Sequence, residues 1–380
     1  MARHMSSTFI HGASLNEQNL FQGLMEGGVA AGLELINQLE NRSDRAHDLV
    51  AVCRQVALLL PGDPSAVNRL YGAALADRDP VYARAVQHVL SLLDPGQGLV
   101  NPPPLLEQVE QPDFVRPMLF RESAGAVHEV LALLWEGAEH VFRRDPSTYG
   151  VTGLERVSFA ARTPLARAYA GIARALGLTK TPLFQRRSAG PITVSLALLS
   201  PPAVVLSGEV RHETPELCFH LGAMLAGTVP RHALLFGSPE SQARAVLKGL
   251  GFAFGPPREN AGHLGAVMNL AEVLWESIPA RYQRRLRELC DDPETLDYDA
   301  AFQAARMSVR RAGLFASGDL GVALRETGLE DGAPQGFLDS PDAIQRFCAV
   351  NAAAQSLLNL ALSPEYARTR WQFARGTTRY

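Results

Sequence analysis

The sequence contains little lysine, few cysteines and no long hydrophobic run. Only Lys180 and Lys248 are lysines, so nearly all of the 36 basic residues are arginines, and the net charge is −3. A chain with this balance has no global attraction for nucleic acids or for anionic membranes. The longest run without a charged residue, 188–208, contains three prolines and is too interrupted for a membrane-spanning helix. We therefore expect a soluble protein that does not insert into a membrane.

The four cysteines, Cys53, Cys218, Cys290 and Cys348, are scattered along the chain and show no C-x-x-C spacing. This pattern argues against a cysteine-only zinc site and favours free, buried thiols in a reducing compartment. No basic-then-apolar signal segment follows the polar first residues. We therefore expect a cytoplasmic location.

The chain has an ordinary globular composition, with 47% hydrophobic and 20% charged residues over 380 positions. Its length suits two or three domains, or one large domain with a helical annex. Three prolines in the segment 96–105 mark the clearest boundary, because they cannot continue a helix. We expect five segments, namely a disordered leader (1–18), a helical-hairpin arm (19–95), a proline-rich linker (96–116), a main domain (117–330) and a C-terminal helical extension (331–380).

The arm shows the periodicity of paired helices. Apolar residues recur at three-and-four spacing from Leu20 to Leu60, and a second helical pair follows the sequence PGDP. In this second pair Leu70, Ala83 and Pro95 stand at the offsets of a tetratricopeptide repeat, which the segment resembles loosely over about one repeat. A generic helical hairpin is the alternative interpretation. Either one predicts about four helices before the linker.

The only β signal lies in the middle of the chain. The segments LFQRRS, ITVSLAL and AVVLSG are short, rich in β-branched residues and punctuated by Gly and Pro. Long helical patterns precede them at about 124–143 and 165–176, and helical patterns continue after Gly208 almost to the end. We predict a mostly α (α+β) fold in which one small sheet, within 183–207, packs against a helix at 214–227.

The helix at 214–227 carries strong start signals. Thr214 is a good N-cap, Pro215 suits the first helical position, and Glu216 favours the positive end of the helix dipole. The stretch from Ser207 to His232 holds a His-Glu pair and two further histidines, but the zinc-binding arrangement H-E-x-x-H is absent. That arrangement places two imidazoles on one helical face. The helix therefore has the setting of a zinc helix without its ligands.

This order of strands, loop and helix is similar to that of the gluzincin metalloproteases of the CAAX-prenyl-protease and heat-shock-membrane-protease type. The resemblance covers roughly Leu119 to Gly328. It matches Glu216-Leu217 to the family's E-L and Arg231-His232 to its trailing R-H. The family's H-E-x-x-H then falls on Ala223, Met224, Leu225, Ala226 and Gly227. In this alignment both imidazoles and the catalytic carboxylate are replaced by small or apolar groups.

The family's third zinc ligand also has no counterpart. It is a glutamate in the pattern E-x-x-A-D-x-x-G-L, which matches RMSVRRAGL and places Arg306 at the glutamate and Arg310 at the aspartate. A cation cannot ligate zinc, and two cations oppose its charge. The resemblance therefore implies an inactive domain with no catalytic residue, no metal and no cofactor. Its vestigial metal-site positions are Ala223, Met224, Gly227, Arg306 and Arg310.

A displaced metal site is the alternative. Its candidate residues are His212, Glu213, His220 and His232. His212 and Glu213 precede Pro215 and cannot form the i, i+4 pair of a zinc helix, and a structural role is the simpler interpretation of His220. In the sequence WEGAEH, Glu136 and His140 share a helix face beside Glu139, which is typical of a solvated acidic helix end.

An arginine-rich helix offers a second alternative. Arg281, Arg284, Arg285 and Arg287 surround Tyr282, which permits nucleic-acid contact, but Leu286 and Leu289 favour an amphipathic helix with solvated arginines.

The sequence therefore favours a non-catalytic pseudo-metalloprotease scaffold. We expect it to bind protein partners through its helical arm and its vacant cleft, without nucleic acid. A peptidase with a rearranged metal site and a nucleic-acid binder are the competing functions. The sequence gives no indication of the oligomeric state.

Overall fold

The computed structural model describes residues 28–371, except for 41, 105–111, 257–264 and 293–295. The predicted leader, 1–18, lies outside the described residues. The chain divides into two compact units, each of which is described by itself: residues 1–103 together with 327–380, and residues 104–326.

The first unit is helical. Two of its helices, which start at Pro64 and Pro80, have aspartate N-caps. Asp63 accepts a hydrogen bond from the backbone N–H of Ser65, and Asp79 accepts from those of Val81 and Tyr82. Proline follows each cap at the first helical position. The helices of this unit are residues 28–39, η1 (Ser43–Arg45), α2 (Ala46–Leu59), α3 (Pro64–Ala76), α4 (Pro80–Leu93), η2 (Pro95–Gln97), α15 (Pro341–Val350), α16 (Ala352–Ala361) and α17 (Pro364–Arg370).

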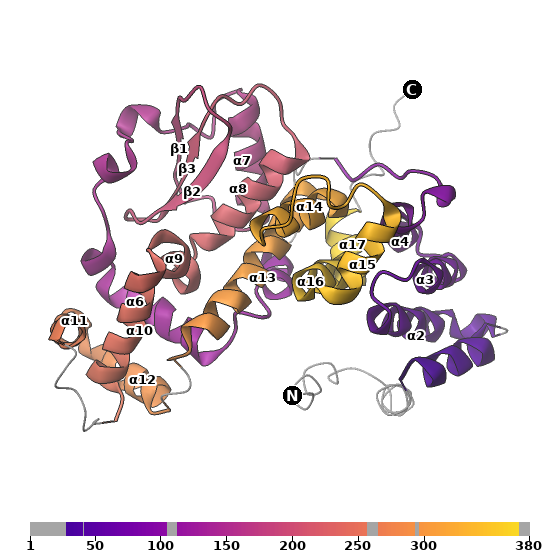
Figure 1. Ribbon diagram of the computed structural model, residues 1–380, viewed down its shortest axis with the longest axis horizontal. Coiled ribbons are helices and arrows are strands. Elements are labelled where there is room, and N and C mark those ends of the chain that lie inside the picture. Colours follow the sequence, from indigo (N-terminus) through magenta and orange to yellow (C-terminus); the bar gives the residue numbers. More distant parts are fainter. Residues whose placement is uncertain (1–27, 41, 105–111, 257–264, 293–295, 372–380) are drawn as a thin grey trace. The chain divides into compact units, whose positions relative to one another are not determined.

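The C-terminal helices α15, α16 and α17 all contact α4, so they belong to the same unit as the arm (Figure 1). The Tyr82 hydroxyl donates to the carbonyl of Leu362 at 2.9 Å, and the Gln345 side chain donates to the carbonyl of Leu93 at 2.9 Å. Cys53, Val86 and Leu90 are buried in the resulting core. The segment that the sequence set apart as an extension therefore completes the arm's hydrophobic core.

The predicted linker, 96–116, extends too far. The helix α5 (Pro112–Leu119) begins within it, at a proline that fits the first turn of a helix because its missing N–H is not needed there. The prolines at 102–104 remain outside helices, as expected.

The second unit holds the sheet and the remaining helices. The long helices predicted at 124–143 and 165–176 are confirmed as α6 and α7, to within two residues. The elements of this unit after α5 are α6 (Ala126–Phe142), η3 (Pro146–Tyr149), η4 (Gly153–Glu155), α7 (Pro164–Ala175), β1 (Leu183–Arg186), β2 (Thr193–Ala197), β3 (Ala203–Ser207), α8 (Pro215–Gly227), α9 (Pro230–Gly237), α10 (Glu240–Phe254), α11 (Gly265–Ser277), α12 (Ala280–Cys290), α13 (Tyr298–Ser317) and α14 (Leu320–Glu330), the last of which ends beyond the unit's boundary.

The sheet has the order β1-β3-β2, with β3 parallel to β1 and antiparallel to β2. The central strand β3 is buried along its whole length, because side chains that alternate between the two faces meet protein on both. Ala203 and Val205 pack with Val151 and Phe184 on one face. The helix α8 contacts β2 and β3 (Figure 1). The predicted mostly α fold with one small sheet against helix 214–227 is confirmed.

The helix α8 also packs along α13, and this is the most extensive helix pairing among the described residues of the unit. A larger core joins residues of β2, α6, α9, α10, α12 and α13, among them Leu134, Leu234, Leu250 and Leu286. The helix α8 therefore packs against both the sheet and α13. None of the helices within the described ranges is both long enough and apolar enough to cross a bilayer.

Candidate functional site

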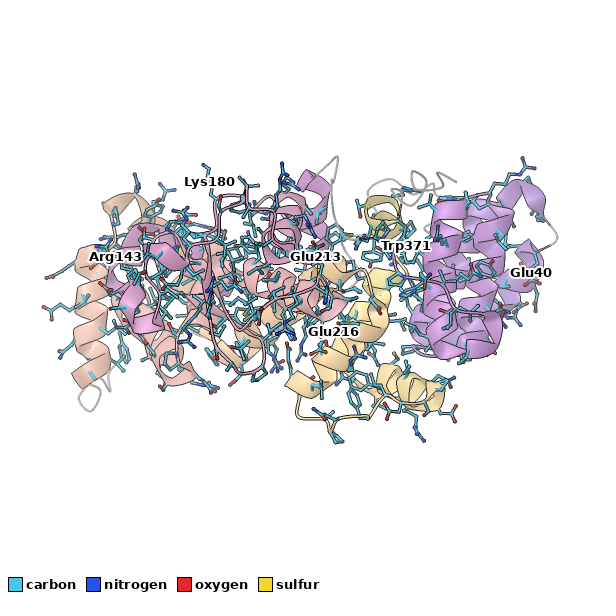
Figure 2. The ribbon with its side chains drawn as sticks, turned by 90° about the horizontal axis from the view of Figure 1, so that it is seen from above. Glu40, Arg143, Lys180, Glu213, Glu216 and Trp371 are labelled. Atoms are coloured by element: carbon cyan, nitrogen blue, oxygen red, sulfur yellow. The ribbon has the colours of Figure 1, made fainter. Side chains whose placement is uncertain are left out.

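The beginning of α8 is built as the sequence predicted. The Thr214 hydroxyl accepts a hydrogen bond from the backbone N–H of Leu217 at 3.2 Å, and Pro215 is the first helical residue. Glu213 and Glu216 lie at this same end of the helix (Figure 2). Glu213 forms an ion pair with Arg167 of α7 at 2.8 Å.

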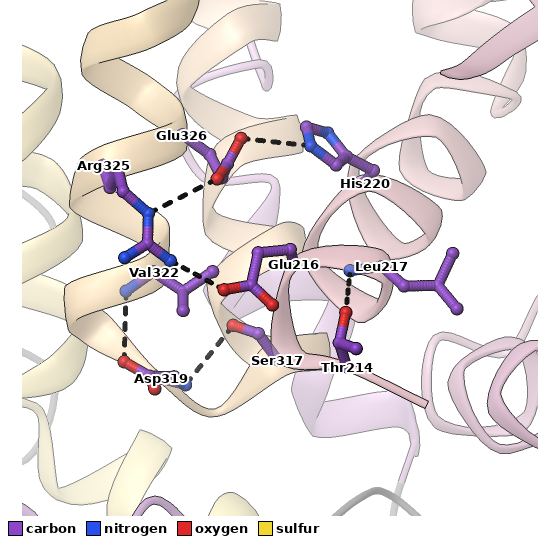
Figure 3. A network of polar contacts seen from close by, with 9 residues as sticks. All are labelled: Thr214, Glu216, Leu217, His220, Ser317, Asp319, Val322, Arg325 and Glu326. Atoms are coloured by element: carbon purple, nitrogen blue, oxygen red, sulfur yellow. Dashed lines mark hydrogen bonds and ion pairs between the residues drawn. The ribbon is translucent and has the colours of Figure 1, made fainter. Parts of the chain in front are cut away.

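One face of α8 forms a polar network with α14 (Figure 3). Glu216 accepts from Arg325 at 2.7 Å, and one turn later His220 Nε2 lies 3.2 Å from a carboxylate oxygen of Glu326. Arg325 also lies 3.7 Å from Glu326 and links the two pairs. His220 and Glu216 therefore tie α8 to α14.

A second face of α8 meets α13 at van der Waals distance. A Cβ atom added at Gly222 would lie 2.4 Å from the Cβ of Ala316 and 2.8 Å from the carbonyl oxygen of Ala312. A Cβ atom added at Gly313 would lie 2.7 Å from the ring of Phe219. Glycine at both crossing positions allows the helix backbones to approach this closely. The interface between α8 and α13 is therefore filled by backbone, by small side chains and by the ring of Phe219.

Two of the three α8 positions that the resemblance assigns to a metal site are buried. Ala223 is 2% exposed, Gly227 is buried and Met224 is half-buried. A Cβ atom at Gly227 would meet Leu196 of β2 at 3.4 Å and the ring of Phe236 of α9 at 3.5 Å. Gly227 therefore faces the sheet and α9, where apolar side chains are in contact with it.

A chain of ring contacts connects Gly227 to Arg306. The ring of Phe236, which borders Gly227, lies 5.6 Å from that of Phe302, and the guanidinium of Arg306 lies 5.8 Å from the Phe302 ring centre. Arg310, one turn further along α13, is 3% exposed. Two phenylalanine rings thus lie between Gly227 and Arg306, which are two of the positions that the alignment assigns to zinc ligands.

The four residues of the alternative metal site do not come together. His212 is exposed in the loop before α8, Glu213 pairs with Arg167, and His220 pairs with Glu326. His232 is fully buried, and its Nδ1 lies 3.1 Å from the carbonyl oxygen of Ala226. Across the described residues, no three His, Cys, Asp or Glu side chains form a group suited to a metal ion.

His232 instead belongs to a buried histidine pair that the sequence did not indicate. Its ring lies 5.8 Å from that of His128 of α6, whose Nε2 is 3.1 Å from the carbonyl oxygen of Ala301. Because each ring donates its N–H to a carbonyl, His128 Nδ1 and His232 Nε2 are bare acceptors, and neither has a hydrogen-bond partner in the described structure. Burial lowers the pKa of His128 to about 4 and that of His232 to about 3.

Neither of the other clusters singled out in the sequence forms a site. Glu136 and His140 are exposed, which agrees with a solvated helix end, and Glu139 accepts from the Ser200 hydroxyl at 2.8 Å. On α12, Arg285 forms two hydrogen bonds with Glu129, at 2.7 and 3.0 Å. The neighbouring arginines are also engaged: Arg284 pairs with Glu288, Arg287 lies over the ring of Trp275, and Arg281 lies over that of Tyr282.

The four cysteines occupy buried positions, and three of them have raised pKa values. All four are buried and none forms a disulfide, as the sequence predicted. Burial raises the pKa of Cys53 and Cys348 to about 12 and that of Cys290 to about 11. Since the thiolate is the nucleophile, these raised pKa values disfavour the reactive form of Cys53, Cys290 and Cys348 near neutral pH.

The helical arm carries a hollow of about 430 Å³, between α3, α4 and the segment after η2. We name it the arm groove. Two of its leucines are strongly exposed, Leu75 by 53% and Leu99 by 87%. Sequence periodicity could not reveal it, because one wall is an irregular segment. Its main lining residues are Tyr71, Leu75, Arg84, Gln87, Leu99 and Asn101.

No protein-family model, curated protein or solved structure matches this chain.

Proposed function

We propose that the protein is a non-catalytic, metalloprotease-like scaffold that binds other proteins through its helical arm. One observation supports the non-catalytic part of this proposal. The helices α8 and α13, which would hold the zinc ligands of an active relative, are in direct contact at Gly222 and Ala316. Zinc catalysis needs three protein ligands and an open fourth position for water. The ring of Phe236 and the side chain of Leu196 lie beside Gly227, which leaves little room for such a position.

The arm supplies the support for binding. The arm groove lies in a unit whose helices are held together by their own core, and the groove exposes apolar side chains to solvent. We assign no binding to the cleft of the metalloprotease-like unit, since apolar side chains pack beside the vestigial positions.

The metal content of the protein tests the non-catalytic part. Protein purified without chelators should contain far less than one zinc per chain by elemental analysis, and should leave unfolded casein intact. Alanine variants of His212, His220 and His232 should not alter either result. One zinc per chain that is lost in any of these variants would instead establish the rearranged peptidase site.

Restoring the ligands tests the alignment itself. A variant with Ala223→His, Met224→Glu, Gly227→His and Arg306→Glu should gain no thermal stability from zinc while Phe236 is present. Adding Phe236→Ala, which removes the ring nearest residue 227, should allow a zinc-dependent rise in Tm. A rise with Phe236 in place would contradict the packing argument. No rise in either variant, with both folded, would contradict the alignment.

A further inference from the structure

The arm groove has fixed walls. The α3–α4 hairpin is capped at both helix starts by aspartates, and Arg78 makes the turn between them with a φ of 58°. The third wall is the extended segment 98–101, which is attached to α4 because His88 Nδ1 lies 2.9 Å from the carbonyl oxygen of Val100. Asp94 accepts from the N–H of Gly96 and orders the preceding turn. The hollow is therefore present before any ligand binds, as small binding sites usually are.

Two apolar side chains that line the groove are strongly exposed. Single exposed leucines are common on protein surfaces, but here Leu75 and Leu99 border the same hollow from two different elements. A volume of about 430 Å³ is in the range of small-ligand sites and admits side chains rather than a folded domain.

The polar lining selects the charge of an occupant. Arg84 is exposed on α4 and, in the part of the chain that the structure describes, it forms no ion pair or hydrogen bond. No Asp or Glu lines the groove among the described residues. A carboxylate that enters beside Arg84 would therefore meet an unpaired cation, with Gln87 and Asn101 as further hydrogen-bonding groups.

The segment 98–101 favours an extended occupant. It has no strand partner, and within the described residues the backbone groups of Leu99 and Asn101 form no hydrogen bond. Such an edge can pair with a peptide in β-strand fashion. Pro102 follows and has no N–H, so the pairing ends at Asn101. A short stretch of peptide is all that this edge can hold.

We propose that the arm groove binds a short, extended segment of a partner protein in which large apolar and acidic residues alternate. The apolar side chain enters the hollow between Leu75 and Leu99, and the neighbouring carboxylate pairs with Arg84. This assignment rests on the proposed function, because it names the chemistry of the partner that the scaffold binds.

Fluorescence anisotropy with the full chain tests the assignment. The probe is a labelled short peptide of alternating leucine and aspartate, capped at both ends. Peptides of leucine and lysine, and of serine and aspartate, serve as controls. Only the leucine–aspartate peptide should bind well, and Leu99→Asp should weaken it about tenfold or more, since an apolar contact is lost. Leu154→Asp is the matched control, because Leu154 is 95% exposed on the other unit and should have no effect.

A charge reversal separates recognition from a general loss of fold. Arg84→Glu should bind the leucine–lysine peptide in preference to the leucine–aspartate peptide, while its melting curve stays unchanged. Equal binding of both peptides by the natural protein, or equal effects of Leu99→Asp and Leu154→Asp, would overturn the assignment. A concentration-dependent dimer that Leu99→Asp dissociates would also overturn it, in favour of a second copy of this chain as the occupant.

The samples from the binding assay also distinguish the groove assignment from the proposed non-catalytic function. Mass spectrometry of the incubated peptide should show it intact. A peptide that binds and is cleaved would contradict the non-catalytic function while leaving the groove assigned. An intact peptide that does not bind would contradict the groove and leave the metal measurements to decide the function.

Discussion

Replacement of Gly222 by alanine should destabilise the second unit, although alanine is normally the better helix residue. The added Cβ atom would lie 2.4 Å from the Cβ of Ala316 and 2.8 Å from the carbonyl oxygen of Ala312. Neither contacted atom can rotate away, because one is an alanine Cβ and the other belongs to the backbone. Ordinary contact would require α8 and α13 to separate by about 1 Å, which disturbs close packing along the whole interface.

The magnitude follows from two opposing effects. Overpacking of a filled core costs about 1–3 kcal/mol, and the rigidity of both contacts places this site near the upper limit. Replacement of a helical glycine by alanine returns about 0.5–1 kcal/mol. The net loss in the free energy of unfolding is therefore about 2 kcal/mol, or a decrease in Tm of about 4–8 °C for a unit of this size.

Gly227→Ala provides a control on the same helix. Its Cβ atom would meet Leu196 and Phe236 at 3.4 and 3.5 Å, which are ordinary contacts. Its Tm should stay within about 2 °C of that of the natural protein. Differential scanning calorimetry measures both variants and separates the transition of this unit from that of the helical arm. A Gly222→Ala protein that melts at or above the natural protein would refute the direct contact between α8 and α13, and with it the argument that this interface has no room for a metal site.

Two further predictions concern buried polar groups. In the unfolded chain His128 and His232 bind protons near pH 6.5, whereas burial keeps them neutral in the folded unit down to about pH 4 and pH 3, respectively. The unfolded state therefore binds more protons, so the free energy of unfolding should fall as the pH is lowered from 6.5 to 4. In denaturant titrations, the free energy of unfolding of His128→Gln should depend less steeply on pH than that of the natural protein. In the helical arm, Tyr82→Phe removes the hydrogen bond to the buried carbonyl of Leu362. The free energy of unfolding, measured in denaturant titrations, should fall by about 0.5–1.5 kcal/mol. An unchanged value would contradict the role of the C-terminal helices in this unit.

The amino-acid sequence by itself determined the fold class, the three strands and several of the helices. The β-branched segments gave the three strands, and Thr214 with Pro215 gave the start of α8, because caps and hydrophobic periodicity act within a few residues. Pro112 was assigned to a linker although it opens α5, since proline is equally suited to a first helical turn and to an extended segment.

Only the tertiary structure decided which distant residues meet. Tyr82 forms a hydrogen bond with Leu362, and His128 lies against His232. The ring of Phe302 lies between the ring of Phe236 and Arg306. Apart from Phe302 and Arg306, the residues in contact are far apart in the sequence, and no local pattern encodes their contacts. The arm groove likewise exists only because His88 holds an irregular segment beside two helices. Periodicity records which face of a helix is buried, but the partner of that face is set by the packing of the whole chain.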